Sequence, residues 1–107
     1  MLPTIIVSAM TEASLKAAIM KELSKEGFFW RVGGGPYGVS GCPDILGIWD
    51  GWTIGIEVKT PEAYRKKDRG CTANQIHFME KMIDNGAIVM VVCSVEQVRE
   101  FLTALKG

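Results

Sequence analysis

The dipeptide Asp50-Gly51 separates two apolar, alternating runs, residues 44–49 and 52–59, and it restricts the possible fold more than any other feature of the chain. A tight type I′ turn needs positive φ at both central positions, and Asp-Gly is a preferred pair there. With these residues as the turn, Trp49 faces Trp52 and Ile48 faces Thr53. A four-residue loop centred on the same point keeps this register, whereas a three-residue loop shifts it by one residue.

The same register gathers three charged residues at the open end of the hairpin. Asp44 faces Glu57, so both carboxylates lie on one face of the sheet with Cβ atoms about 5 Å apart. Lys59, two residues beyond Glu57, shares that face. Opposed like charges destabilise a sheet, and a divalent cation such as Mg²⁺ or Mn²⁺ would offset their repulsion. The alternative is that both acids splay apart at the strand ends and are solvated.

Helices and further strands are expected on both sides of the hairpin. Residues 28–32 predict a strand, and the apolar run at 87–94 is typical of a strand buried on both faces. Apolar residues at helical spacing predict helices at 11–25, at 72–85 and from Ser94 onward, with loops at 33–41 and 60–71. The order α-β-β-β-α-β-α makes residues 1–107 one domain of the α/β class, with a mixed sheet flanked by helices.

Two polar residues extend the apolar stripes of the predicted helices. Glu12 continues the Leu15, Ile19 and Leu23 stripe by one turn, so it is expected to point towards the sheet. The alternative for Glu12 is a favourable acid in the first helical turn. Gln75 precedes Met79, Met82 and Ile83 on the inward face of its helix. A capping box with Thr72 would also explain Gln75.

Charge and composition narrow the function classes. Twelve Lys and Arg residues balance twelve Asp and Glu residues, which argues against a binder that relies on net charge alone. The segment after Lys59 is nevertheless basic, with Arg65, Lys66, Lys67 and Arg69. The N-terminal residues lack the basic start of a secretory signal, and no apolar run is long enough for a membrane span. Three cysteines without a C-x-x-C spacing suit reduced thiols, so a cytoplasmic location is expected.

These elements together resemble a known family. The stretch "GCPDILGIWDGWTIGIEVKT" is similar to the P-D…(D/E)-x-K signature of restriction-endonuclease-like nucleases. With Glu12 ahead of it and Gln75 behind it, the chain resembles the VRR-NUC family, the virus-type replication-repair nucleases, over about residues 12–100. The resemblance implies a restriction-endonuclease-like core and a metal-dependent, structure-selective DNA endonuclease of phage type. Stand-alone members are associated with resolving four-way (Holliday) junctions.

The resemblance also implies roles for individual residues. Asp44 and Glu57 would bind one or two Mg²⁺ ions, for which Mn²⁺ can substitute, together with the Val58 carbonyl and with Glu12 directly or through water. Lys59 would orient water and stabilise charge on phosphorus, and Gln75 would complete the site. The expected DNA-binding residues are Arg31, Arg65, Lys66, Lys67 and Arg69. For the last four, a solvated charged loop is the alternative.

Several functions remain open at this stage. Symmetric junction cutting needs two active sites, so a homodimer is expected, with the apolar residues Leu2 to Val7 as one contributor to the interface. A monomeric flap or nicking endonuclease is the alternative among enzymes. A non-catalytic module that binds branched DNA is the alternative from another class. A thiol enzyme using Cys42 or Cys93 lacks a neighbouring His in the sequence. DNA is the expected partner in each nuclease case, in a phage-infected or bacterial cytoplasm.

Overall fold

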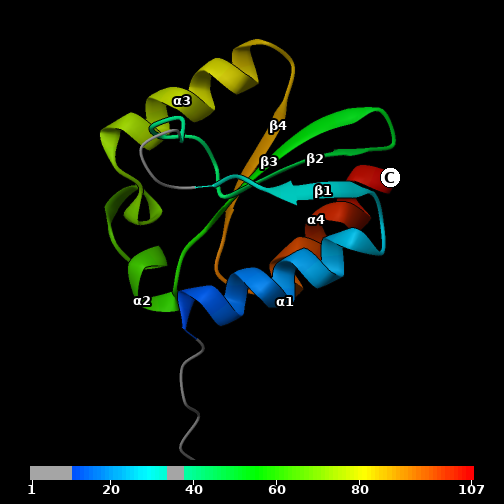
Figure 1. Cartoon of the computed structure of the whole chain (residues 1–107), viewed down its shortest axis with the longest axis horizontal. Helices are drawn as coiled ribbons and strands as arrows, with labels where there is room; N and C mark the ends of the chain where they lie inside the picture. Colours follow the sequence, from blue (N-terminus) through cyan, green and yellow to red (C-terminus); the bar gives the residue numbers. More distant parts are fainter. Residues whose placement is uncertain (1–10, 34–37) are drawn as a thin grey trace, which may run out of the picture.

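The computed structural model describes residues 11–33 and 38–107 and shows an α/β fold built on a four-stranded mixed sheet (Figure 1). The strands lie in the order β1-β2-β3-β4; β2 pairs antiparallel with both β1 and β3, and β4 runs parallel to β3. The predicted interface residues Leu2 to Val7 and residues 34–37 of the predicted loop at 33–41 lie outside the described residues. In chain order the elements are α1 Glu12–Ser24, β1 Phe28–Arg31, β2 Ile45–Trp49, β3 Trp52–Val58, α2 Pro61–Tyr64, the 3₁₀ helix η1 Lys67–Gly70, α3 Ala73–Asp84, β4 Ile88–Val92 and α4 Val95–Lys106.

The β2–β3 hairpin has the predicted register. Trp49 pairs with Trp52 and Ile48 with Thr53. Asp50 has φ of 48° and Gly51 has φ of 82°, as a turn with two positive φ values requires. The ladder continues to the pair of Ile45 with Ile56. Asp44 and Glu57 are the next residues along the two strands, so the turn determines that they meet.

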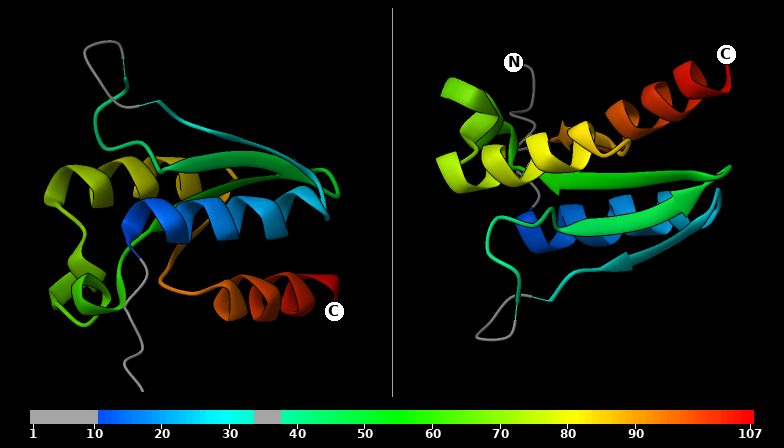
Figure 2. Two further views of the ribbon diagram at one scale, coloured as in Figure 1. Left: turned by 60° about the horizontal axis from the view of Figure 1, so that its bottom comes forward. Right: turned by 90° about the horizontal axis from the view of Figure 1, so that it is seen from above.

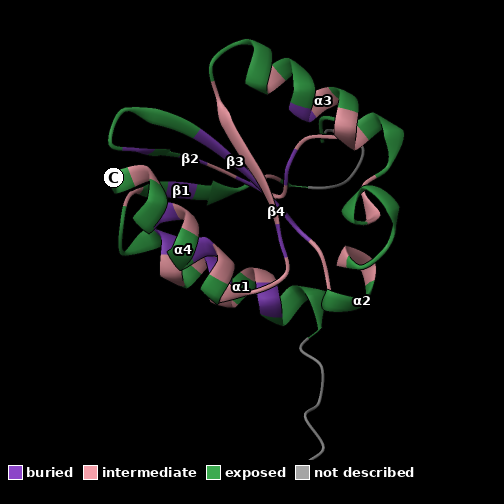
Figure 3. Ribbon diagram, turned by 180° about the vertical axis from the view of Figure 1, so that it is seen from behind, coloured by how far each residue is buried: buried purple, intermediate pink, exposed green. Residues whose placement is uncertain are grey.

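Helices cover the two faces of the sheet unequally. Figure 1 shows α1 and α4 below the sheet and α3 above it. The main core lies between the sheet and the helices α1 and α4, and α3 supplies only Met79 as a buried residue (Figure 3). On the other face of the sheet, the Met82 side chain of α3 packs against Gly55. A Cβ added at Gly55 would lie 3.0 Å from the methyl carbon of Met82. The core residues are Leu15, Ile19, Leu23, Phe29, Ile45, Trp49, Ile54, Ile56, Val58, Val92, Val98 and Leu102.

The strand β4 differs from the prediction of a strand buried on both faces. It is an edge strand that pairs with β3 and with no other strand of the described residues, and of its five residues only Val92 is fully buried. The apolar run reflects partial cover by α3 and α4 and not a central position. Ile83 is also more exposed than predicted, at 54%, because α3 contacts the sheet mainly through Met79 and Met82.

The segment 60–71 was expected to be a loop but contains two short helices. The Thr60 side chain accepts a hydrogen bond from the Ala63 N–H at 3.2 Å, and Pro61 occupies the first helical position of α2. This is the N-cap and N1 pattern that begins helices. Asp68 and Arg69 follow with φ of 55° each, and Gly70 has φ of 77°. Three successive positive φ values turn the chain back towards α3.

The open end of the hairpin and its turn lie at opposite ends of the molecule. The β2–β3 turn lies beside the C-terminal end of α4, whereas the N-terminal ends of α1 and α3 and the helix α2 gather at the other end (Figures 1 and 2). Because β3 ends at Val58, its last residues lie at the end of the molecule where α2 and the N-terminal ends of α1 and α3 gather. None of the helices in residues 11–33 and 38–107 is long and apolar enough to cross a membrane.

Candidate active site

Asp44 is held in place by backbone groups of two neighbouring strands. Its Oδ2 accepts a hydrogen bond from the N–H of Val58 at 2.8 Å, and its main-chain oxygen accepts one from the N–H of Val32 at 2.9 Å. Val58 directly follows Glu57. The hydrogen bond therefore ties the Asp44 carboxylate to the end of β3 that carries Glu57.

Glu57 is the one charged residue that is buried in the described ranges, with 3% of its surface exposed. Its Oε1 is buried, and no group in residues 11–33 and 38–107 donates a hydrogen bond to it. Burial, and next the nearby Asp44 charge, raise the pKa of Glu57 to about 7, and Lys59 only partly opposes this. A buried acceptor without a partner is costly, so this oxygen needs either a proton or a cation.

Lys59 and Gln75 hold the second oxygen of Glu57. Lys59 Nζ lies 3.3 Å from Glu57 Oε2, and Gln75 Nε2 donates to the same oxygen at 2.8 Å. Gln75 Oε1 accepts from Lys59 Nζ at 3.1 Å and from the Thr72 N–H at 2.9 Å. The capping box of Gln75 is therefore present, and the same amide also contacts Lys59 and Glu57.

Glu12 does not point into the site as predicted. Its side chain is 53% exposed, because it occupies the first position of α1, beyond the part of the helix that faces the sheet. It reaches the site only through Lys16, whose Nζ lies 3.4 Å from Glu12 Oε1 and 3.0 Å from Asp44 Oδ1. Partial burial alone would lower the pKa of Lys16, but the hydrogen bond to Asp44, with the Asp44 and Glu12 charges, raises it above its usual value.

Sequence reasoning did not single out Lys16. The one local signal was its spacing of four residues from Glu12, which favours an ion pair on a helix. The contact with Asp44 depends on how α1 packs against the sheet.

The carboxylate pair fits a divalent cation with few protein ligands. Within residues 11–33 and 38–107, no three His, Cys, Asp or Glu side chains lie close enough to hold a metal ion together. Mg²⁺ commonly binds through one or two carboxylates and completes its shell with water and phosphate oxygens. Asp44 and Glu57 would supply two hard oxygen donors, and the Glu57 Oε1 is the acceptor that such a cation, or a proton, would satisfy.

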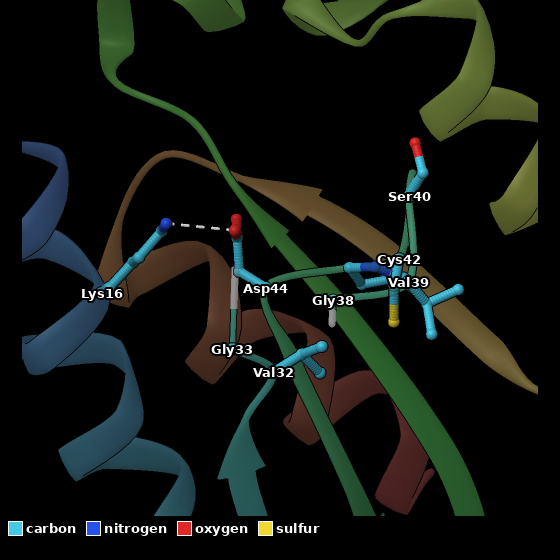
Figure 4. Close-up of a pocket in the computed structure, with 9 residues that line it drawn as sticks. Lys16, Val32, Gly33, Gly38, Val39, Ser40, Cys42 and Asp44 are labelled. Atoms are coloured by element: carbon cyan, nitrogen blue, oxygen red, sulfur yellow. Dashed lines mark ion pairs between the residues drawn. The ribbon is translucent and has the colours of Figure 1, made fainter. Parts of the chain in front are cut away.

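An open cleft of about 370 Å³ adjoins Asp44 (Figure 4). Lys16 forms one wall and points towards Asp44 from α1, while the chain from Gly38 to Pro43 forms the opposite wall. The described loop residues on that wall are exposed except near Pro43, which is buried. A ligand group that binds at Asp44 can therefore reach it from solvent through this cleft.

The basic segment lies next to the site, anchored at both ends. It begins after Lys59 and ends before α3, and the Lys59–Gln75 hydrogen bond joins the two ends. Its exposed basic side chains form no ion pair within the described residues, although the Arg69 guanidinium lies 4.4 Å from the centre of the Tyr64 ring. Arg65, Lys66, Lys67 and Arg69 are the predicted DNA-binding residues in this segment.

Arg31, the fifth predicted DNA-binding residue, is exposed but less favourably placed. It pairs with Ile45, the residue after Asp44, so its side chain leaves the opposite face of the sheet.

The thiols near the site are not activated. Burial, followed by the charges of Glu57 and Asp44, raises the pKa of Cys42. Burial also raises the pKa of Cys71, against the opposing effect of Lys59. Both remain neutral thiols at neutral pH, and all three cysteines are free. A nucleophilic role would need the opposite shift.

Comparisons of the chain with protein-family models, with curated proteins and with solved structures give no match. The contacts described above define the candidate site. It consists of Asp44, Glu57, Lys59 and Gln75, with Lys16 and Glu12 at its border.

Proposed function

We propose that this protein is a metal-dependent, structure-selective DNA endonuclease that cuts four-way junctions as a homodimer. The observation that carries the proposal is the buried Glu57 Oε1, which receives no hydrogen bond from a donor in the described part of the chain, together with the nearby Asp44 carboxylate. The resemblance to the VRR-NUC nucleases rests on the same residues. The strand and helix order around the mixed sheet supports a restriction-endonuclease-like core.

Each site residue has a distinct task in this proposal. Asp44, Glu57 and the Val58 carbonyl would hold Mg²⁺ or Mn²⁺, which, when bound, supplies Lewis acidity towards phosphate and water. Glu12 would act through water or through Lys16. Lys59 would orient the attacking water and stabilise the negative charge that develops on the phosphate. Gln75 fixes Lys59 and Glu57 relative to each other through its two hydrogen bonds.

DNA would cross the site over the basic segment. Its lysines and arginines, which form no ion pair in the described part of the chain, follow Lys59 in the sequence and would contact phosphates that flank the cut, with Arg31 as a more distant contact. Such contacts position DNA without reading its sequence. The product ends expected from the family resemblance are a 5′-phosphate and a 3′-hydroxyl, and the expected place of action is a bacterial or phage-infected cytoplasm.

A homodimer is proposed because one chain offers one site, whereas symmetric junction cutting needs two. An exposed apolar patch supports an interface: Phe28 is 70% exposed, Ile48 49% and Trp30 39%, on the part of the sheet that helices leave uncovered. Phe28 and Trp30 pack against each other with ring centres 5.4 Å apart. Light scattering should give twice the chain mass, and serine substitutions at Phe28 and Trp30 should shift it to the monomer.

The test of function compares DNA substrates of the same sequence. Purified protein is incubated with a labelled four-way junction, a flap and a linear duplex, with Mg²⁺ or with a chelator. The proposal predicts Mg²⁺-dependent cutting of the junction, and a loss of at least about hundredfold in Lys59→Met. The exposed Lys81→Met on α3 is the matched control and should cut normally.

The alternatives predict other results. Cutting of the flap alone by a monomer would favour the flap or nicking endonuclease. Tight junction binding without cutting under any divalent cation would favour the non-catalytic binding module. Cutting in the chelator, or full activity in Lys59→Met, would contradict the proposed chemistry.

A further inference from the structure

Lys16 forms an ion pair with the candidate metal ligand Asp44. Its Nζ lies 3.0 Å from Asp44 Oδ1, and both side chains are largely shielded, at 28% and 21% exposure. Lys16 belongs to α1, and Asp44 is the residue that precedes β2. The ion pair therefore joins two separate elements at the site (Figure 4). Side chains shielded to this degree interact more strongly than exposed surface pairs.

The contacts of the four carboxylate oxygens show which of them are free to bind a cation. Asp44 Oδ2 accepts from the Val58 N–H, and Glu57 Oε2 accepts from Gln75 and contacts Lys59. Glu57 Oε1 receives no hydrogen bond from any residue that the structure describes. The remaining oxygen, Asp44 Oδ1, is the one held by Lys16. Of the two oxygens available to an external cation, one therefore already has an ammonium bound to it.

The Lys16 side chain also has an alternative place to bind. It forms a wall of the cleft of about 370 Å³ that opens beside Asp44. The same cleft is lined by Gly33 and Gly38, which have no side chain to obstruct a ligand, and by Ser40, which offers a hydroxyl group. A phosphate oxygen in this cleft would lie within the range of an ammonium that had left Asp44.

We infer that Lys16 is an exchangeable cation of the site: it neutralises Asp44 and competes with a divalent cation, and once released it binds a phosphate group of the DNA. The inference rests on the proposed function for the identity of the phosphate. Two cations on one carboxylate oxygen repel each other, so occupancy by one weakens the other. Coupling between metal and DNA binding then follows, because the free form of Lys16 exists mainly in the metal-loaded protein.

The first test measures metal affinity alone. Mn²⁺ is titrated calorimetrically into the wild type, Lys16→Met, Lys16→Arg and the control Lys21→Met, which alters an exposed lysine of the same helix. Removal of the competing charge should tighten Mn²⁺ binding about tenfold in Lys16→Met. Lys16→Arg and Lys21→Met should bind as the wild type does. Thermal unfolding checks that each variant is folded.

The second test measures DNA binding with and without a metal. Junction DNA is titrated into each protein in Ca²⁺ and in a chelator, and the binding is followed by fluorescence anisotropy. Lys16→Met should weaken binding about three- to tenfold in Ca²⁺, as loss of one phosphate contact would, and should change it little in the chelator.

The possible outcomes separate this inference from the proposed function. Mn²⁺ binding by the wild type with no gain in Lys16→Met would overturn the inference alone, because Lys16 would then only fasten α1 to the sheet. An equal loss of DNA affinity with and without metal would also overturn it. Absence of Mn²⁺ binding in both the wild type and Lys16→Met would contradict the inference and the proposed function together. Mn²⁺ binding only in Lys16→Met would support the inference strongly.

Discussion

The backbone N–H of Val58 donates a hydrogen bond of 2.8 Å to Oδ2 of Asp44, a residue fourteen positions earlier in the chain. This contact fixes the Asp44 carboxylate beside Glu57 and leaves Oδ1 free for another partner. It also explains how two acids persist together at a sheet end: a backbone dipole, Lys16 and Lys59 each neutralise part of their charge.

The metal-free protein should lose stability as pH rises between about 4.5 and 7. The pKa of Glu57 is raised to about 7 in the folded protein, so in this window the folded state binds more protons than the unfolded state. Unfolding then releases a proton, and the free energy of unfolding should fall by roughly 3 kcal/mol across the window. Urea unfolding in a chelator at several pH values measures this.

Glu57→Gln is the control for this pH dependence. It removes the titrating carboxyl, so most of the slope should disappear, and the variant should be more stable than the wild type at pH 8 without metal. An unchanged slope in Glu57→Gln would show that another group is responsible.

Asp44→Asn and Asp44→Ala should differ in stability but not in function. The Asn oxygen can still accept from the Val58 N–H, whereas Ala leaves this buried donor without a partner, at about 1–3 kcal/mol. Both variants should lose Mn²⁺ binding, because the charged donor is absent in each. Thermal unfolding and Mn²⁺ titration together check the prediction. Equal stability of the two variants would mean that the hydrogen bond contributes little.

Gln75→Ala and Gln75→Glu should separate capping from site geometry. Ala removes the capping box and both contacts with Lys59 and Glu57, so we expect a loss of about 1 kcal/mol in stability and a lower cleavage rate. The substituted Glu side chain keeps an oxygen that can accept from the Thr72 N–H and from Lys59. It also adds a third carboxylate to the pair formed by Asp44 and Glu57. Gln75→Glu should therefore raise the pKa of Glu57 further. NMR titration of the Glu57 carboxyl measures this, and an unchanged or lower value would refute it.

The basic segment should control the salt dependence of DNA binding. The double variant Lys66→Ala and Lys67→Ala removes two exposed, unpaired charges, so the slope of log affinity against log salt should decrease by about two. The control is Lys81→Ala on α3. Anisotropy titrations of junction DNA at several salt concentrations give the slope. An unchanged slope would mean that these lysines form a solvated surface only.

The parts of the site that follow from local chemistry were predictable from the sequence. The Asp-Gly turn fixes the strand register as far as the pair of Ile45 with Ile56. Asp44 and Glu57 are the next residues on the two strands, and Lys59 Nζ lies 3.3 Å from Glu57 Oε2. Gln75 was predictable because it lies at a fixed position in a capping box. In each case a few neighbouring residues determine the geometry.

The parts of the fold and of the site that depend on the packing of distant elements were not predictable from the sequence. Lys16 meets Asp44 only because of the way α1 packs against the sheet, and no sequence period encodes that packing. Glu12 continues the helical stripe but lies where the helix extends past the sheet, so its predicted inward direction was wrong. For β4, a continuous apolar run did not distinguish an edge strand from a central one.

The most direct test of the account is the initial rate of junction cleavage as a function of Mg²⁺ concentration, in the wild type and in Glu57→Gln. The account predicts a rate that rises to saturation with Mg²⁺ in the wild type, is zero in a chelator, and falls at least about hundredfold in Glu57→Gln at every concentration. A Glu57→Gln protein that cuts as fast as the wild type, or a wild type that cuts without any divalent cation, would contradict it.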